Sequence, residues 1–226
     1  MPSSIHLSGV SDGLFYALRD RLIRAGASIA EEPNEAEYTV SIGIDQKTDL
    51  AVLPPGDAPI DSSLAVIVSD VIVPNGKREW DNGKILDWIE MVKRGESLKQ
   101  NEEPRFWVNS RDVVDALSVI CLSDKAATLN GQIRMCGRRA WVSDDVFDEI
   151  RVLWERYVNA VNHSHTAESL SGTPSPVRGI EDEKPDSPDL APLHKTLIEI
   201  SGEGWHPLVP LRTSLMEMIA SSERLA

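Results

Sequence analysis

Residues 4–26, SIHLSGVSDGLFYALRDRLIRAG, pass from an alternating apolar run through a glycine turn into a segment with helical spacing. Residues 4–8 predict a short strand, and the segment from Gly9 to Gly13 predicts a tight turn. Apolar residues then recur on one helical face, at Leu14, Leu18, Leu22 and Ile23. Gly26 is expected to end this helix, so the chain opens as strand, glycine turn and helix.

The rest of the chain continues to alternate strands with helices. Strands are predicted at residues 27–30, 38–44, 49–53, 64–73, 105–108 and 131–136, the fourth of these being a β-branched run typical of a buried parallel sheet. Helices are predicted over 82–94, after a cap at Ser110, from Ser143 to about residue 158, and over a last segment that carries Leu211, Leu215, Met216 and Ile219. The connections between the early strands are short, so most crossover helices of a parallel sheet are expected to be missing or shrunken.

The composition changes between about residues 160 and 192. This stretch is rich in Ser, Pro, Asp and Glu and has almost no large apolar side chains, which predicts a disordered linker or a long loop. The chain therefore divides into a core at 1–159, the linker at 160–192 and a C-terminal segment at 193–226. That last segment is expected to pack back on the core, because it is too small to hold a core of its own.

The charge and the cysteines exclude several classes of protein. The formal net charge is −13, with 36 acidic against 23 basic residues, which argues against a nucleic-acid partner. Cys121 and Cys136 lie in apolar stretches and predict buried thiols. No metal site is expected, because the close pair His163 and His165 has no neighbouring ligand set. No run approaches the length of a membrane span, so we expect a cytoplasmic protein that is not inserted in a membrane.

Four segments, in order along the chain, resemble motifs of the extended short-chain dehydrogenase/reductases, the nucleotide-sugar epimerases and dehydratases. Residues 69–76 resemble that family's Asn-Val-Tyr-Gly-Pro turn, and residues 105–116 resemble its arginine strand and the following Asp-Val helix. Residues 129–150 resemble its glycine-rich strand, serine cap and helix, and residues 204–207 resemble the Gly-Trp-x-Pro before its final helix. The resemblance implies an α/β, Rossmann-like, mostly parallel sheet with helices on both faces, together with a small C-terminal α/β portion.

The opening segment also resembles the dinucleotide fingerprint of these enzymes. The resemblance implies candidate cofactor-binding residues at Gly9, Ser11, Asp12, Gly13 and Glu31. The third glycine of the fingerprint is replaced by Phe15 or Tyr16, depending on the spacing applied, and Asp12 adds a negative charge beside the expected pyrophosphate. The alternative is that the two glycines only make a turn and the glutamates are solvated. We expect NAD or NADP to bind weakly or not at all.

The catalytic residues of the family have no counterpart in this chain. Those enzymes use a Tyr with a Lys four residues later, and a Ser or Thr at a strand end. The three tyrosines, Tyr16, Tyr38 and Tyr157, are followed four positions later by Asp20, Ile42 and Val161. Only residues 57–63 separate the strand that should end in the Ser or Thr from the next strand, too few for the catalytic helix. We therefore assign no catalytic residue, and expect the fold to be reduced by the loss of this helix.

The substrate side keeps one candidate residue. Arg105 stands where the family has an arginine that meets the sugar-nucleotide diphosphate, and a guanidinium suits that role. Asp70 replaces the family's turn asparagine, and an anion there repels a diphosphate. The alternative is that Arg105 is a surface or salt-bridged residue.

These features lead to two hypotheses of function. The first is a non-catalytic pseudoenzyme with an NAD(P)-binding type of fold, acting as an accessory or structural subunit through protein–protein binding. Its partner is another protein or a second copy of the chain, with a nucleotide as a possible further ligand. The alternative is an active NAD(P)-dependent nucleotide-sugar epimerase/dehydratase or reductase that uses non-standard or partner-supplied residues.

Overall fold

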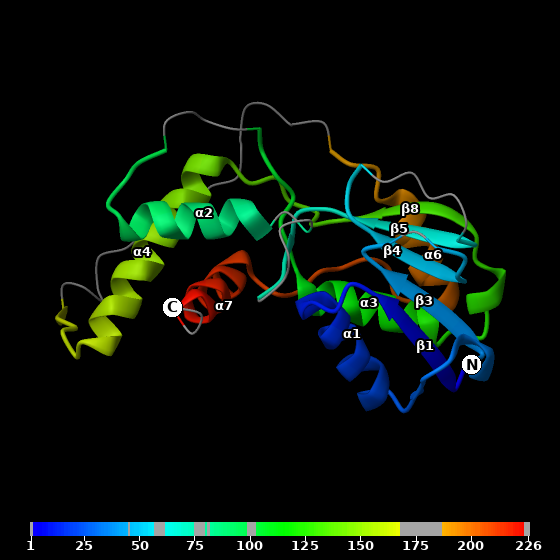
Figure 1. The fold of residues 1–226 in the computed structure, drawn as a ribbon. Helices are drawn as coiled ribbons and strands as arrows, with labels where there is room; N and C mark the ends of the chain where they lie inside the picture. The colour runs from blue at the N-terminus through cyan, green and yellow to red at the C-terminus, as the bar shows by residue number, and fades with distance from the viewer. Residues whose placement is uncertain are drawn as a thin grey trace.

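The fold is built on a six-stranded parallel sheet (Figure 1). The computed structural model describes residues 2–44, 46–56, 62–74, 80, 82–98, 103–167 and 187–223. The strands are β1 (Ser4–Gly9), β2 (Ser28–Ala30), β3 (Tyr38–Ile42), β4 (Leu50–Leu53), β5 (Leu64–Val68) and β8 (Gly131–Met135), in the order β2-β1-β3-β4-β5-β8. Every neighbouring pair is parallel, which confirms the predicted Rossmann-like α/β class.

The strand order reverses between β1 and β3, and we call the carboxyl ends of these two strands the crevice. The chain leaves β1 for β2 on one side and then returns to the other side of β1 as β3. In open parallel sheets, ligands bind outside the carboxyl ends of the strands at the point where the order reverses. The carboxyl ends of β1 and β3, at Gly9 and Ile42, are therefore the place to look for a site.

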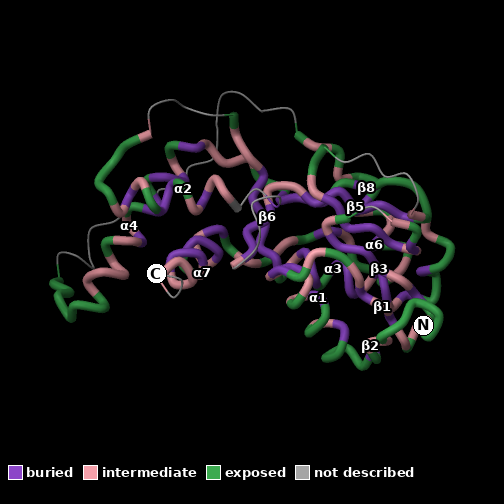
Figure 2. Tube along the Cα trace, in the orientation of Figure 1, coloured by how far each residue is buried: buried purple, intermediate pink, exposed green. Residues whose placement is uncertain are grey.

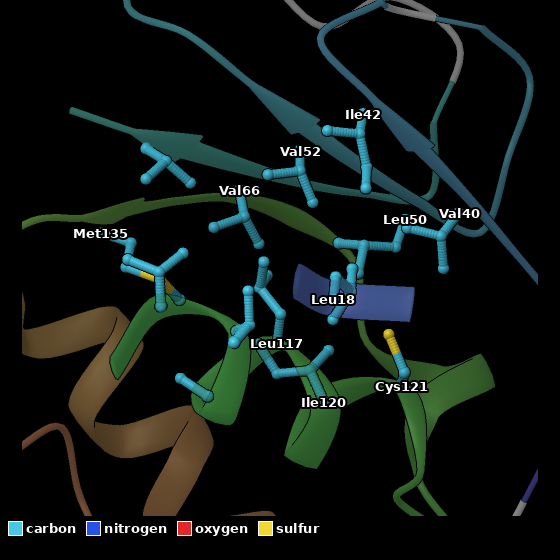
Figure 3. Packing of buried hydrophobic residues seen from close by; sticks show 14 of the residues in the cluster. Leu18, Val40, Ile42, Leu50, Val52, Val66, Leu117, Ile120, Cys121 and Met135 are labelled. Atoms are coloured by element: carbon cyan, nitrogen blue, oxygen red, sulfur yellow. The ribbon is translucent and has the colours of Figure 1, made fainter. Parts of the chain in front are cut away.

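Three helices pack on one face of this sheet: α1 (Gly13–Arg24), α3 (Ser110–Cys121) and α6 (Ala191–Ser201). Figure 3 shows Leu18 of α1 and Leu117 of α3 meeting Val52 and Val66 of the sheet. We expected helices on both faces. The described parts of the connections at 43–49 and 54–63 contain no helix, because these connections are too short to cross back over the sheet.

A second unit has its own core. It consists of a two-stranded parallel sheet, β6 (Val71–Ile72) with β7 (Val108–Asn109), and three helices, α2 (Asn82–Lys93), α4 (Ser143–Val161) and α7 (Leu211–Ser222). Its core includes Ile72, Ile89, Trp107, Ile150 and Leu215. The three helices lie together at the opposite end of the molecule from β1 and β2, and their inward faces are buried in Figure 2.

The two units are interleaved along the chain. The short 3-10 helices η1 (Pro33–Glu35) and η3 (Ala126–Thr128) belong to connections of the first unit. The C-terminal segment is shared between the units, since α6 packs on α3 and β8 while α7 packs on α2 and α4. Of the predicted linker at 160–192, residues 168–186 lie outside the described residues, and α4 and α6 extend into its two ends.

The predicted strand at 64–73 was wrong in one respect, because it is two strands in two different sheets. Asp70 adopts the left-handed conformation, with φ of 54°, and turns the chain from β5 into β6. A run of β-branched residues does not reveal such a turn, because Asp tolerates this conformation only at an energetic cost that tertiary contacts must offset.

Two further element boundaries differ from the prediction. The strand expected at 105–108 begins only at Val108, and Arg105 instead forms an isolated antiparallel bridge with Trp141. Ser110 is the first residue of α3 and not its cap, since the Asn109 side chain accepts the hydrogen bond from the Arg111 N–H at 2.7 Å. Asn and Ser are both favoured as helix N-caps, so the sequence by itself does not decide whether Asn109 or Ser110 caps α3.

No helix within the described ranges is both long and apolar enough to cross a membrane.

The turn after β1 depends on the absence of a side chain at Gly9. Its φ is 112°, and a Cβ there would lie 2.2 Å from the Ile42 carbonyl oxygen, which accepts a hydrogen bond from the Val10 N–H at 2.8 Å. We expect Gly9→Ala to lower the free energy of unfolding by about 3–5 kcal/mol, through strain and overpacking together. Gly26→Ala is the matched control, because Gly26 has φ of 94° but no atom within 4 Å, and should cost about 1–2 kcal/mol. Urea unfolding measures both, and equal losses would refute the close-approach argument.

Candidate functional site

The candidate site is the crevice at the carboxyl ends of β1 and β3. Gly9 ends β1, and Gly43, with φ of 71°, follows β3. A Cβ on Gly43 would lie 3.0 Å from a methyl group of Val10. Both glycines are therefore required here by the packing of the chain against itself, whether or not a ligand approaches them.

Asp12 closes the amino end of α1. Its side chain is only 5% exposed, and its Oδ1 accepts hydrogen bonds from the N–H groups of Leu14 at 3.0 Å and Phe15 at 3.1 Å. These N–H groups are the ones that a helix amino terminus offers to a bound phosphate. In this chain an internal carboxylate already holds them.

The second oxygen of Asp12 is held by Trp80. The indole Nε1 donates a hydrogen bond of 2.6 Å to Asp12 Oδ2, and Trp80 is only 1% exposed. The same ring passes 3.8 Å from the Cβ position of Gly43, so it spans from the end of β1 to the end of β3. An aromatic ring and a carboxylate with both oxygens hydrogen-bonded therefore lie at the ends of β1 and β3.

The residues present are a poor fit for a dinucleotide pyrophosphate. The carboxylate of Asp12 repels a pyrophosphate at the head of α1 and competes for the same N–H donors. The other candidates are solvent-accessible and lie at this edge of the sheet: Gly9, Ser11 and Gly13 in the turn, and Glu31 directly after the parallel neighbour β2. The structure therefore brings the five predicted residues to one edge, but it uses Asp12 as a helix cap.

None of the tyrosines is placed for proton transfer in the crevice. Tyr38 is buried among the core residues of the first unit, and burial raises the pKa of its phenol well above the usual value. Tyr157 stacks on Trp154 beside the second core, with ring centroids 5.7 Å apart. Tyr16 is exposed on α1.

Arg105, the candidate substrate-binding residue, is paired with Asp70. Its Nη1 lies 3.1 Å from Asp70 Oδ1, and the Phe106 N–H donates to Asp70 Oδ2 at 2.7 Å. The guanidinium also lies over the ring of Trp107, 5.7 Å from its centroid. The aspartate that we expected to repel a diphosphate thus engages the arginine that we expected to bind one.

Neither cysteine is a candidate nucleophile. Cys121 and Cys136 are buried and unpaired, and burial raises the pKa of each thiol to about 12. Across the described parts of the chain, no three side chains of His, Cys, Asp or Glu come together to hold a metal ion.

Sequence reasoning missed the role of Trp80. Trp80 is buried, and its indole N–H needs an acceptor there. Asp12 and Trp80 are separated by 68 positions, and no local spacing connects them. The only available signal was the pairing rule itself, that a buried carboxylate and a buried indole N–H each need a partner.

We expect the Asp12–Trp80 contact to stabilise the fold measurably. Trp80→Phe leaves a buried carboxylate oxygen without its donor and should cost about 1.5–3 kcal/mol. Asp12→Ser keeps a residue that caps the helix but removes the acceptor of the Trp80 indole N–H. The double variant with Trp80→Phe should therefore show a coupling energy of at least about 1 kcal/mol in urea unfolding.

Trp205→Phe is the matched control, because Trp205 is equally buried and its Nε1 donates to a neutral acceptor, the Cys136 carbonyl, at 2.8 Å. Its effect should add to that of Asp12→Ser within about 0.5 kcal/mol. Additivity in both cycles would refute the contact.

Comparison with known proteins finds similarity in structure only. No protein-family model matches the sequence, and no curated protein matches it. Among solved structures, RMD from Pseudomonas aeruginosa complexed with NADPH is 9% identical, with a TM-score of 0.59 over 100% of this chain and 99% of that chain.

Two epimerases are similar to the same degree. UDP-N-acetylglucosamine 4-epimerase from Bacillus cereus is 10% identical, with a TM-score of 0.55 over 96% of this chain and 98% of that one. A UDP-galactose 4-epimerase is 11% identical, with a TM-score of 0.55 over 98% and 99%. These likenesses, at 9–11% identity, show the fold alone: the chain has the Rossmann-like α/β fold of these solved structures.

Proposed function

We propose that this chain is a non-catalytic protein with the fold of the nucleotide-sugar epimerases and dehydratases, and that it acts by binding a protein partner as an accessory subunit. The observation that supports this most is the contact between Asp12 and Trp80 in the crevice. It places the protein's own groups where proteins of this architecture bind the pyrophosphate of a dinucleotide.

The chemistry of the chain supports the same proposal. Hydride transfer to or from a sugar alcohol requires a group that exchanges a proton at the reacting oxygen. None of the three tyrosines is followed by a lysine four residues later, and Tyr38 is enclosed by the core. An active enzyme would need this group from a non-standard residue of the chain or from a second chain, which is the alternative function.

A partner role is favoured by apolar side chains on the outer surface of α1. Tyr16 and Ile23 are 55% and 45% exposed and lie seven residues apart, two turns along one side of the helix. The negative net charge makes a nucleic acid or an anionic membrane an unfavourable partner, so we propose a protein.

We expect no measurable binding of NAD or NADP by the purified protein at concentrations up to about 1 mM, in isothermal titration. The reason is the competition between Asp12 and the pyrophosphate for the N–H groups of α1. Asp12→Gly removes this carboxylate and should raise the affinity at least about tenfold, whereas Asp20→Gly, on the same helix, should not. A dissociation constant in the low micromolar range for the natural sequence would overturn the proposal and favour the alternative.

We also expect no turnover of nucleotide sugars by the chain alone. The purified protein is incubated with NAD or NADP and a panel of UDP- and GDP-sugars, while nicotinamide absorbance and products are followed. Turnover above about one per second contradicts the non-catalytic proposal. Turnover that arises only with the complex isolated from the native cell favours the alternative, in which a partner supplies the missing residues.

The partner itself is sought by isolating the tagged chain from its native cell and measuring the mass of the complex by light scattering. A second protein in fixed stoichiometry, lost on Tyr16→Glu with Ile23→Glu, supports the proposed role and this surface of α1. A chain that is recovered only as a monomer contradicts it.

A further inference from the structure

The second unit contains a pocket between α4 and α7, away from the crevice. Its volume is about 310 Å³, which is at the lower end of the range for small-molecule sites. Its walls include Leu153, Arg156 and Tyr157 of α4 and Arg212, Met216 and Ile219 of α7. We call this the α4–α7 pocket.

Helical spacing brings these side chains together. On α4, residues 149, 153, 156 and 160 share one face, and on α7, residues 212, 216 and 219 share another. The two helices pack on each other, so these faces meet. Glu149, at the start of the α4 face, is only 1% exposed and lies under the arginines.

The charges in and under the pocket are unequal. Arg212 Nε lies 2.9 Å from Glu149 Oε1. Burial raises the pKa of Glu149, and the charges of Arg212 and Arg156 offset only part of that rise. Two guanidinium groups therefore stand against one carboxylate. The pocket keeps an excess positive charge that an anion would neutralise.

Both arginines have buried nitrogens that lack an acceptor. Arg156 Nε and Arg212 Nη2 are inaccessible to solvent and have no hydrogen-bond partner among the described residues, and the same is true of both carboxylate oxygens of Glu149. A buried donor without a partner costs free energy, and charged donors cost more. Arg156 and Arg212 both line the pocket, and a guanidinium group is a planar donor suited to a carboxylate.

The rest of the wall is apolar. Leu153 and Ile219 are buried, the ring of Tyr157 lines one side, and Met216 is exposed near the opening. A free inorganic anion would leave these groups in contact with water, whereas an aliphatic body would cover them. The adaptable side chain of methionine suits a flexible chain.

We propose that the α4–α7 pocket binds a monocarboxylate with an aliphatic body, its head group on Arg156 and Arg212 and its hydrocarbon chain against Leu153, Met216 and Ile219. This inference does not rest on the proposed function of the crevice, because the pocket lies in the core of the other unit.

The test is titration of the purified full chain with octanoate, acetate, inorganic phosphate and octanol, followed by calorimetry. Octanoate should bind with a sub-millimolar dissociation constant, and each other probe at least about tenfold more weakly. Octanol binding as tightly as octanoate would overturn the role of the arginines. Phosphate or acetate binding as tightly as octanoate would overturn the role of the apolar wall, and no binding of octanoate would overturn the whole proposal.

Two variants locate the site. Arg156→Gln should weaken octanoate binding at least about tenfold while leaving the Arg212–Glu149 pair in place. Ala160→Phe, at an exposed position on the pocket wall, should block it by filling the space. Arg151→Gln is the matched control on the same helix, because Arg151 is exposed, pairs with Asp148 and lies outside the pocket, so affinity should not change. Unchanged binding in both pocket variants would place octanoate elsewhere and refute the assignment.

Discussion

The carboxylate of Asp12 is the group on which the carboxyl edge of the sheet depends. Burying a charge costs free energy that hydrogen bonds offset, and Asp12 accepts three, from two N–H groups of α1 and the indole of Trp80. These bonds join the end of β1 to the start of α1 and to the residue that leads into α2. The Asp12 side chain thus connects the end of the parallel sheet with the segment that precedes α2 of the second unit.

Two other connections between the units are held in the same way. Asp70 turns the chain out of β5 and accepts from the Phe106 N–H, so that the outgoing and returning segments are joined. Asp112, at the start of α3, accepts from the N–H groups of Leu208 and Val209, just before α7. Acidic side chains bonded to backbone N–H groups therefore fix these two crossings, so part of the chain's negative charge has a structural role.

The glycine turn and the unpartnered guanidinium nitrogens lie in different units of the protein. At the strand ends, Asp12 holds two N–H groups of α1, whereas in the second unit Arg156 and Arg212 each have a guanidinium nitrogen without a partner among the described residues. The glycines at the crevice persist under packing constraints of their own, since a side chain at Gly9 would collide with the β3 backbone.

The sequence by itself determined the local elements and the absence of the catalytic pair. The helical spacing of Leu14, Leu18 and Leu22 and the β-branched runs predicted α1 and the parallel strands, because periodicity and turn residues act over a few positions. The absence of Tyr-x-x-x-Lys is a property of the sequence alone. The five candidate residues at the crevice were also brought to one edge, as strand order in this fold predicts.

Tertiary structure alone decided what those residues do. The pairing of Asp12 with Trp80, the left-handed turn at Asp70 and its ion pair with Arg105 join positions far apart in the chain, and no local pattern records such a contact. The same holds for the sheet order, the single helix-covered face and the two guanidinium groups that meet across α4 and α7. Each depends on how packed elements satisfy buried charges and donors, and that free energy exists only once the chain has folded.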